Sequence, residues 1–198
     1  RPPRRPIDVF LLGDRLEHRK FLNENFPKVP YRRALFVKSS GQAKVYAYRQ
    51  PELAIDLRHE CTHAILHSEL DLVPLWLDEG IAEYFEAAPD ERAFGHPHLG
   101  ALKWNMRLGM VRTIEALEEK HELSDMNTAD YRFSWAWTHF MFHGPQAAYG
   151  VLLDYLNAVR RGSPPGVFSK RMAEALPDAA DQMVQHFKNW KRPTVAST

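Results

Sequence analysis

Residues 52–70, ELAIDLRHECTHAILHSEL, and residues 75–88, LWLDEGIAEYFEAA, decide the expected architecture of this chain. The first stretch follows a proline, where the strand signals of the chain stop, and the second lies between Pro74 and Pro89. Proline is tolerated at the start of a helix and ends one that runs into it, so both stretches are predicted to be helices. The short loop through residues 71–74 would let the two helices pack antiparallel.

The residues before these helices predict strands and one further helix. The apolar run IDVFLL (7–12) ends at Gly13 and is predicted to be a buried strand. Asp14 is expected to cap a helix that runs to about Asn25, with Glu17 three residues after the cap as in a capping box.

A hairpin is predicted next, and helices after it. RALFVK (33–38) and AKVYAYR (43–49) flank the turn SSGQ, and the alternating pattern of the second segment suits a half-exposed or edge strand. FGHPHLG (94–100) is predicted to be a loop. Further helices are predicted at 113–121, 129–143 (capped by Thr128 and stopped at Gly144), 146–161, 166–176 and 178–191.

These elements predict an α+β fold in which a small N-terminal mixed sheet with helices precedes an all-helical C-terminal half. The helix predicted at 52–70 would lie between the two parts. Length favours one domain, which we place at residues 7–191. The basic, proline-rich residues 1–6 are predicted to be a linker, and residues 192–198 a flexible tail.

The composition is ordinary for a soluble globular protein, with 44% hydrophobic and 26% charged residues. The net charge of +1 gives no overall field that favours nucleic acid or an anionic membrane. No apolar run approaches the ~18–20 residues of a membrane span. The single cysteine, Cys61, cannot form an internal disulfide. The sequence leaves oligomeric state and compartment open, including an extracytoplasmic location with a signal peptide or anchor removed upstream of Arg1.

The candidate chemistry lies in HECTH, residues 59–63. On a helix, His59 and His63 project from one face about 6 Å apart along the axis, a spacing that suits two ligands of one Zn²⁺. Glu60, beside them, could act as a general base toward a water on the metal. His67 continues the spacing, but it lies about 12 Å from His59 along the axis and is therefore expected to cap or pack.

A catalytic zinc site needs a third protein ligand. Glu79, on the next predicted helix, is the best candidate, because an antiparallel pair of helices would bring it over the two histidines. Glu83 lies one turn later on the same face and is expected to accept a hydrogen bond from His59, as carboxylates do for metal-bound histidines. The alternative is that these carboxylates, with Glu86, form a solvated stripe.

HECTH followed by LWLDEGIAEYFE resembles the gluzincin superfamily of zinc metallopeptidases. The tract is similar to the aminopeptidase N-like branch and more so to bacterial peptidase-MA-like domains of poorly characterised function. The resemblance is clear over residues 55–88 and weaker to about residue 143. It implies zinc ligands at His59, His63 and Glu79, a general base at Glu60 and a supporting carboxylate at Glu83. No counterpart of the glycine-rich exopeptidase motif precedes residue 55, so aminopeptidase specificity is not implied.

Peptide hydrolysis also needs a donor for the developing oxyanion. Tyr131, in the first turn of the helix predicted at 129–143, is the candidate; its segment resembles the tyrosine-bearing helix of the aminopeptidase branch, with Ser134 in place of glycine. His139 and His143 lie deeper in this strongly aromatic helix, so a structural role is favoured for both.

Three other residues and one strand carry weaker signals. Cys61 faces away from His59 and is expected to be a small buried hydrophobe. His96 and His98 could form a lid or a second metal contact, although an ordinary solvated loop is favoured. Residues 43–49 could pair with an extended substrate by analogy with gluzincins.

The sequence therefore predicts a zinc-dependent peptidase that acts on a peptide or protein substrate. Two alternatives remain open. The first is a non-catalytic metal-binding or scaffold module that keeps the fold, against which the presence of Glu60 argues because a structural zinc does not need that carboxylate. The second is hydrolysis of a non-peptide amide on the same scaffold.

Overall fold

The computed structural model describes residues 6–192 and has the predicted α+β fold, a small mixed sheet followed by a helical C-terminal half. Within these residues no helix is both long and apolar enough to cross a membrane. The predicted linker and tail lie outside the described residues, apart from Pro6 and Arg192. The elements are β1 (Asp8–Leu12), α1 (Arg15–Asn25), β2 (Ala34–Ser39), β3 (Gln42–Tyr48), α2 (Leu53–Glu69), α3 (Leu75–Glu86), α4 (His98–Arg107), α5 (Ile114–Glu118), the 3₁₀ turn η1 (Leu123–Asp125), α6 (Thr128–His143), α7 (Gln146–Arg160), α8 (Phe168–Ala175) and α9 (Ala179–Asn189).

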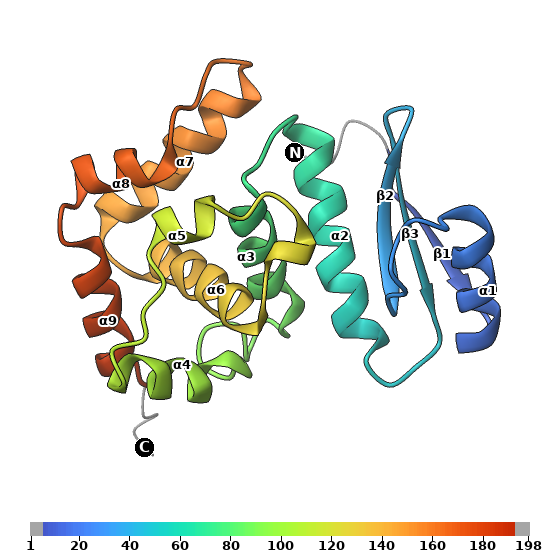
Figure 1. Ribbon diagram of the computed structural model, residues 1–198, viewed down its shortest axis with the longest axis horizontal. Helices are drawn as coiled ribbons and strands as arrows, with labels where there is room; N and C mark the ends of the chain where they lie inside the picture. The colour runs from blue at the N-terminus through green and yellow to red at the C-terminus, as the bar shows by residue number, and fades with distance from the viewer. Residues whose placement is uncertain (1–5, 193–198) are drawn as a thin grey trace, which may run out of the picture.

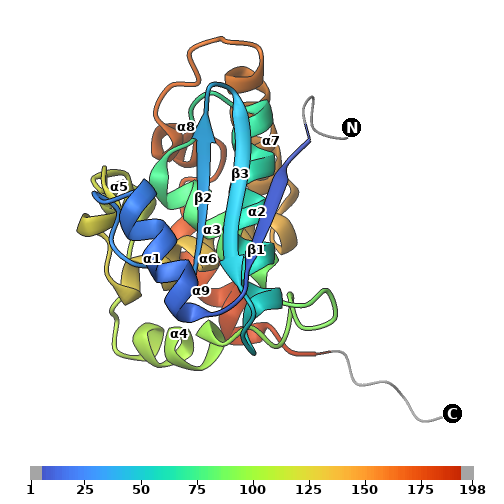
Figure 2. The same ribbon diagram turned by 90° about the vertical axis from the view of Figure 1, so that its right-hand side faces the viewer.

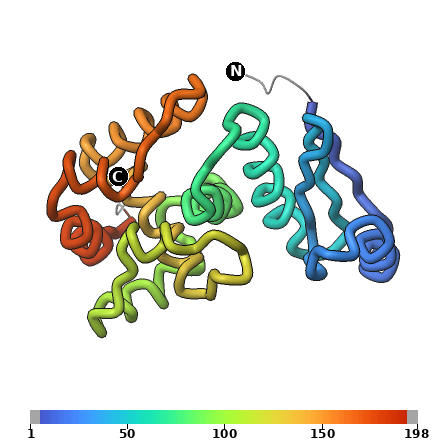
Figure 3. The backbone as a smooth tube through the Cα atoms, turned by 45° about the horizontal axis from the view of Figure 1, so that its top comes forward, coloured from blue at the N-terminus to red at the C-terminus, as the bar shows by residue number. Residues whose placement is uncertain are grey.

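The elements form successive layers (Figure 1). Helix α1 covers one face of the sheet, where Leu22 packs with Leu35 and Tyr46, and α2 covers the other, where Ala64 packs with Val45. Helices α3 and α6 follow behind α2, and α7 to α9 close the far end of the molecule (Figures 1 and 3). Helix α2 therefore lies between the sheet and the helical half, in contact with both.

The sheet has the strand order β1-β3-β2, visible in Figure 2 with α1 in front of the strands. Strands β2 and β3 form the predicted hairpin, in which Ser39 pairs with Gln42 across a two-residue turn. Both turn residues, Ser40 and Gly41, have positive φ (50° and 76°), as a type I′ turn requires. Strand β1 pairs with β3 in parallel.

The predicted exposure of two strands is wrong. Strand β1 was expected to be buried, but it lies at an edge and leaves Val9, Phe10 and Leu11 48%, 42% and 45% exposed. Strand β3 was expected at an edge, but it is central, with Val45 and Ala47 fully buried under α2. The alternation in β3 places small and branched side chains toward α2 and tyrosines toward α1, so both faces are covered.

Most predicted helices are confirmed, but helix α4 was not predicted, and α5 (Ile114–Glu118) is shorter than the helix predicted at 113–121. Two further differences concern a loop and a cap. The loop predicted at 94–100 ends early, because α4 begins at His98. Helix α6 is capped by Asn127 rather than Thr128: the Asn127 side chain accepts from Ala129 N and Asp130 N, and Asp130 completes a capping box.

Helices α3 and α6 approach closely at Gly80. A Cβ atom built on Gly80 would lie 2.6 Å from Thr138 Oγ1 and even closer to the Ser134 carbonyl oxygen. Ser134 and Thr138 are fully buried, and the carbonyl belongs to a helix backbone, so this contact has little room to relax. Glycine at this position therefore sets how near α3 can come to α6.

Replacing Gly80 by alanine should lower the free energy of unfolding by about 1–3 kcal/mol, because the methyl group overpacks a rigid contact. Gly150 in α7 is the matched control: a Cβ built there meets nothing within 4 Å. Gly150→Ala should raise the free energy of unfolding by about 0.5–1 kcal/mol through helix propensity. Chemical denaturation of both variants measures the difference, and equal stabilities would contradict the close approach.

Candidate metal centre

Three side chains predicted as metal ligands converge between α2 and α3. The Nε2 atoms of His59 and His63 lie 3.2 Å apart. The Glu79 carboxylate faces both, with Oε2 3.5 Å from His59 Nε2 and Oε1 3.7 Å from His63 Nε2. Their ligand atoms form a group that could hold a metal ion. Glu79 is only 4% exposed, so the solvated stripe considered for this helix does not form.

Carboxylates on the far side of each ring fix the direction of the imidazole lone pairs. Glu86 Oε2 lies 2.9 Å from His59 Nδ1, and Asp78 Oδ1 lies 2.9 Å from His63 Nδ1. An ionised carboxylate only accepts, so each Nδ1 donates, and a neutral imidazole then presents a lone pair at Nε2. When both imidazoles are neutral, these two lone pairs and the Glu79 carboxylate therefore face one another with no donor between them. A cation is the natural occupant of this arrangement.

The separations fit a tetrahedral ion. Zinc bonds to histidine nitrogen and carboxylate oxygen are about 2.0–2.2 Å long, which makes the ligand-to-ligand edge of a tetrahedron about 3.3–3.6 Å. The three edges between His59, His63 and Glu79 are 3.2, 3.5 and 3.7 Å. The two distances to Glu79 also exceed the usual range of about 2.7–3.2 Å for an N–H···O hydrogen bond. The three residues thus have ligand types and a spacing that could hold a metal ion.

The pKa values describe the same centre without metal. Burial alone would lower the pKa of His59, but Glu79 and Glu86 outweigh burial and raise this pKa well above its ordinary value. Burial is likewise outweighed at His63, where Asp78 raises the pKa. Protons balance the buried carboxylates when no metal does so, and a metal must displace them in order to bind.

The hydrogen bond predicted from His59 to Glu83 is wrong, because Glu86 occupies that position. Glu83 instead faces α4, with Oε2 2.9 Å from His98 Nε2. Its carboxylate still lies near the centre, in a group with His59 and Glu86 whose ligand atoms are within 4.8 Å of one another. The difference arises from the path of α3, which turns Glu86 toward α2 and Glu83 toward the start of α4.

Asp78 is a functional candidate that the sequence reasoning missed. Its Oδ1 holds His63, and its Oδ2 lies 2.9 Å from His67 Nε2. Burial would raise the pKa of Asp78, but the bonds from the two histidines lower it to about 2. His67 also stacks on Phe36, with ring centroids 5.7 Å apart, as its predicted packing role requires. In the sequence, His67 follows His63 by one helical turn and has no assigned partner. That spacing was the signal that one carboxylate could contact both histidines.

Glu60 lies beside the ligands but is anchored to the sheet. Its Oε2 accepts the backbone N–H of Phe36 at 2.7 Å. Phe36 belongs to the edge strand β2, so the bond joins the open edge of the sheet to the helix that carries the metal ligands. Cys61, on the other side of α2, is partly buried and packs in the cluster of Val45 and Ala64. Cys61 was expected to be a small buried hydrophobe, and its side chain is partly buried in this apolar cluster.

Tyr131 is half-buried at the start of α6. Burial raises the pKa of its phenol to about 12, with the negative charges of Glu79 and Glu83 adding to the rise and Arg32 opposing it. The phenol thus stays protonated at neutral pH, and the charges of Glu79 and Glu83 contribute to its raised pKa. Tyr131 does not line the cleft that opens onto Glu60, His63 and Glu79, so its predicted role as a donor at the centre stays a prediction.

His139 and His143 are bound within the helical core. His139 is fully buried; its Nε2 donates to Ala93 O at 3.0 Å, and its Nδ1 lies 3.1 Å from His186 Nε2. Burial lowers the pKa of His139 to about 3. His143 Nε2 lies 2.7 Å from the Tyr84 hydroxyl. These contacts agree with the structural role favoured for both residues.

The solvated loop expected around His96 and His98 does not form. His96 is 3% exposed, stacks on Trp135 with ring centroids 4.4 Å apart, and donates from Nε2 to Glu83 O at 3.0 Å. Burial lowers the pKa of His96 to about 4, with the charge of His98 acting in the same direction. Both histidines therefore contact α3 at Glu83, His96 at the backbone carbonyl and His98 at the carboxylate.

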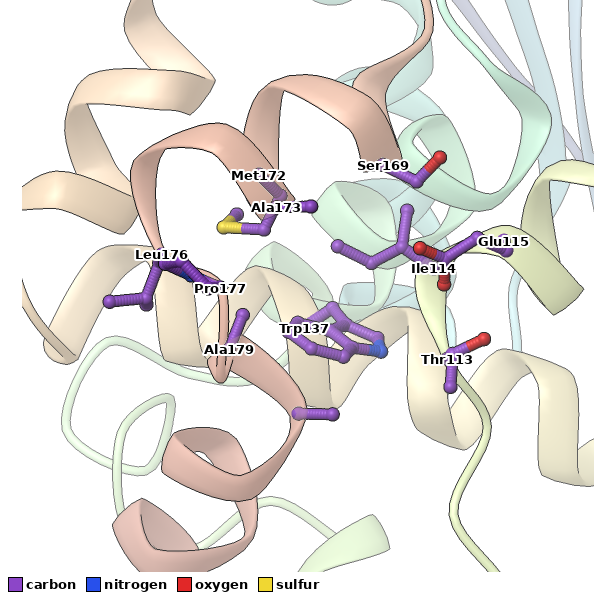
Figure 4. Close-up of a pocket in the computed structure, with 11 residues that line it drawn as sticks. Thr113, Ile114, Glu115, Trp137, Ser169, Met172, Ala173, Leu176, Pro177 and Ala179 are labelled. Atoms are coloured by element: carbon purple, nitrogen blue, oxygen red, sulfur yellow. The ribbon is translucent and has the colours of Figure 1, made fainter.

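A cleft of about 670 Å³ opens onto Glu60, His63 and Glu79. Its volume falls in the range of about 300–1,000 Å³ typical of ligand sites. Strand β2 and the loop before it form one wall, and residues 122–124 form the other. A different hollow, lined by Trp137 and the residues around it (Figure 4), measures about 210 Å³ and lies among α5, α6, α8 and α9. The hollow around Trp137 is smaller than the typical range, so the cleft at the metal centre is the better candidate for a ligand site.

No known family model, curated protein or solved structure matches this chain. The resemblance to gluzincins therefore rests on the residues of the motifs themselves. The geometry described above is independent of that resemblance.

Replacing Glu86 by alanine should weaken Zn²⁺ affinity by about 10–100-fold, because His59 loses the carboxylate that orients it. Glu83→Ala is the matched control from the same helix, and its effect should be smaller because Glu83 contacts His98 instead. Competition with a chromophoric chelator measures both affinities. A larger loss in Glu83→Ala than in Glu86→Ala would contradict the pairing seen here.

Proposed function

We propose that this protein is a zinc-dependent peptidase that hydrolyses peptide bonds, with Glu60 as general base. The observation that carries the proposal is the convergence of His59 Nε2, His63 Nε2 and the Glu79 carboxylate beside a cleft that His63 and Glu79 line. When both imidazoles are neutral, no donor lies between these ligand atoms. Two histidines and one glutamate form a ligand set known from catalytic zinc sites, which keep the fourth position open.

A zinc ion held there would supply a water of lowered pKa and would polarise a substrate carbonyl. The protein's own residues would do the remaining work. Glu86 and Asp78 keep the two imidazoles in the tautomer that binds a metal, and they raise the basicity of both ligands. The scarcely exposed Glu79 adds the negative charge that favours a divalent cation in this interior.

Glu60 is the residue best placed to move the proton. It directly follows His59 on α2 and lines the cleft with His63 and Glu79. Phe36 N–H holds Oε2, which leaves Oε1 free to accept a proton from the attacking water and deliver it to the leaving amine. A purely structural metal would have no use for a carboxylate at this position.

Tyr131 is proposed to donate a hydrogen bond from its hydroxyl to the carbonyl oxygen as negative charge develops there. The raised pKa of about 12 keeps this proton on the phenol at neutral pH. A neutral donor that need not ionise can stabilise the transition state without competing with the metal for charge.

The proposed substrate is an extended peptide. The cleft runs along β2, which lies at an edge of the sheet, and Leu35 and Phe36 line it. An edge strand offers unpaired backbone groups to an added strand. The pairing strand anticipated from the sequence was β3, but that strand is central, so β2 takes this place in the proposal.

A second candidate function is a scaffold or binding module that retains the metal without catalysis. The embedding of the centre in carboxylate–histidine pairs would serve a structural metal as well as a catalytic one. The cleft and Glu60 favour catalysis, because a structural zinc usually has four protein ligands and no access for substrate. Hydrolysis of a non-peptide amide would use the same groups and would be revealed by the choice of substrate.

Glu60→Gln should abolish most peptide turnover while leaving the zinc content near one ion per chain, because the base is lost and the ligands remain. Glu24→Gln, an exposed glutamate on α1, is the control for loss of one negative charge. Turnover of a broad peptide library and metal analysis provide the two readouts. If Glu60→Gln hydrolysed peptides within a few-fold of the wild-type rate, the proposed mechanism would be wrong; if neither protein hydrolysed any, the scaffold function would replace it.

Tyr131→Phe should lower kcat by about 10²–10³ with little change in KM, because the hydroxyl acts mainly in the transition state. Tyr149→Phe, on the outer surface of α7, is the control. Steady-state kinetics on one peptide substrate separate kcat from KM. A normal kcat in Tyr131→Phe would remove Tyr131 from the mechanism.

A further inference from the structure

The loop between α1 and β2 carries arginine and lysine side chains whose surroundings differ. Arg33 is engaged by acidic residues: its Nη2 lies 2.8 Å from Asp56 Oδ1, and its Nη1 lies 3.8 Å from Glu52 Oε2. Its neighbour Arg32 lines the cleft of the metal centre, as does Lys28. Among the described residues, neither Arg32 nor Lys28 has an ion-pair partner.

Arg32 is held in position by the residues on either side. Tyr31 packs against α1, with the guanidinium groups of Arg15 and Arg19 5.9 and 5.4 Å from its ring centroid. Arg33 binds the start of α2 through Asp56. With both neighbours fixed on the outer side, the backbone at Arg32 is constrained, and its half-buried side chain faces the cleft.

The balance of charge in the cleft leaves these cations without an internal partner. With a divalent ion in place, the charges of Glu60 and Glu79 would be offset by the metal, and Asp78 is already engaged by two histidines. The opposite wall offers Glu122, whose carboxylate is used in the capping box of η1. A half-buried guanidinium facing a cleft without a carboxylate is suited to bind one from outside.

We propose that Arg32, assisted by Lys28, forms a subsite that binds a carboxylate of the peptide substrate, which makes the enzyme selective for peptides with an acidic group near the bond to be cleaved. The inference rests on the proposed function in so far as it calls the bound peptide a substrate. Binding of the carboxylate at this subsite does not itself require turnover. The carboxylate can come from an Asp or Glu side chain or from the C-terminus of the peptide.

Peptides that differ at one carboxylate test the subsite. The probes are fluorescein-labelled nonapeptides: one set has an amidated C-terminus and a single Glu or Gln at each position in turn, and another has only Gln and a free C-terminus. Their affinities for the zinc-loaded Glu60→Gln protein are measured by fluorescence anisotropy at two salt concentrations. The same measurements follow in Glu60→Gln proteins that also carry Arg32→Ala, Arg32→Lys or, as a control, Arg161→Gln, which changes an exposed arginine at the end of α7 that does not line the cleft.

We expect one carboxylate-bearing set to bind about 10–100-fold more tightly than its neutral partner, the usual strength of a hydrogen-bonded charge pair. Arg32→Ala should remove this preference, Arg32→Lys should restore part of it, and Arg161→Gln should retain it. High salt should reduce the preference, because the charges are partly exposed. The set that shows the preference identifies the source of the carboxylate.

The inference is overturned if no peptide shows a preference for the carboxylate, or if the preference survives Arg32→Ala. Turnover by the wild-type protein is a separate measurement. An Arg32-dependent preference without any turnover would support the subsite and refute the peptidase. Turnover without the preference would refute the subsite alone.

Discussion

The arrangement of this protein depends on the cost of burying carboxylates. Helix α3 carries several into the interior on one side, and each of them faces a histidine from another element. Ionised carboxylates taken out of water cost several kcal/mol each unless a partner replaces the lost hydration. The pairs are Asp78 with His63 and His67, Glu79 with His59 and His63, Glu86 with His59, and Glu83 with His98. The candidate metal centre is one part of this series.

The opposite side of α3 explains why the series can form at all. Trp76, Leu77 and Ile81 bury an apolar surface against the helical half, and Gly80 lets α6 approach the backbone of α3. Helix α3 is thus held by close packing on one side while its carboxylates meet histidines on the other. The geometry of the centre is set by packing that lies behind it, a common way to keep metal ligands rigid.

The sequence predicted the elements of this site better than its pairings. Proline boundaries located α2 and α3, and the spacing of His59, His63 and Glu79 on two linked helices indicated that they could meet. The spacing could not distinguish Glu83 from Glu86, because both lie on the same helical face as Glu79, and only the crossing of the helices decides which one reaches α2. The role of Asp78 likewise depends on that crossing.

The errors in the sheet have a related cause. Strand β1 is more apolar than β3 in sequence, which favoured a buried position for β1, yet β3 is central because both of its neighbours pair with it. Strand order is a property of the whole chain, and an alternation of large and small side chains can reflect two different covering helices as well as one open face. The tyrosines of β3 face α1, and its small residues allow α2 to lie close to the sheet.

The hydrogen bond between Phe36 and Glu60 has a consequence for any chain that docks along β2. A backbone N–H donates only one short, linear hydrogen bond. The carbonyl of an incoming strand that accepts from Phe36 N–H would therefore compete with the Glu60 carboxylate. Docking in that register would break the hydrogen bond between Phe36 and Glu60 and leave both carboxylate oxygens of Glu60 free to accept other hydrogen bonds. The edge strand would thus hold the Glu60 side chain in place until a chain docks in the matching register, and the docked chain would release it.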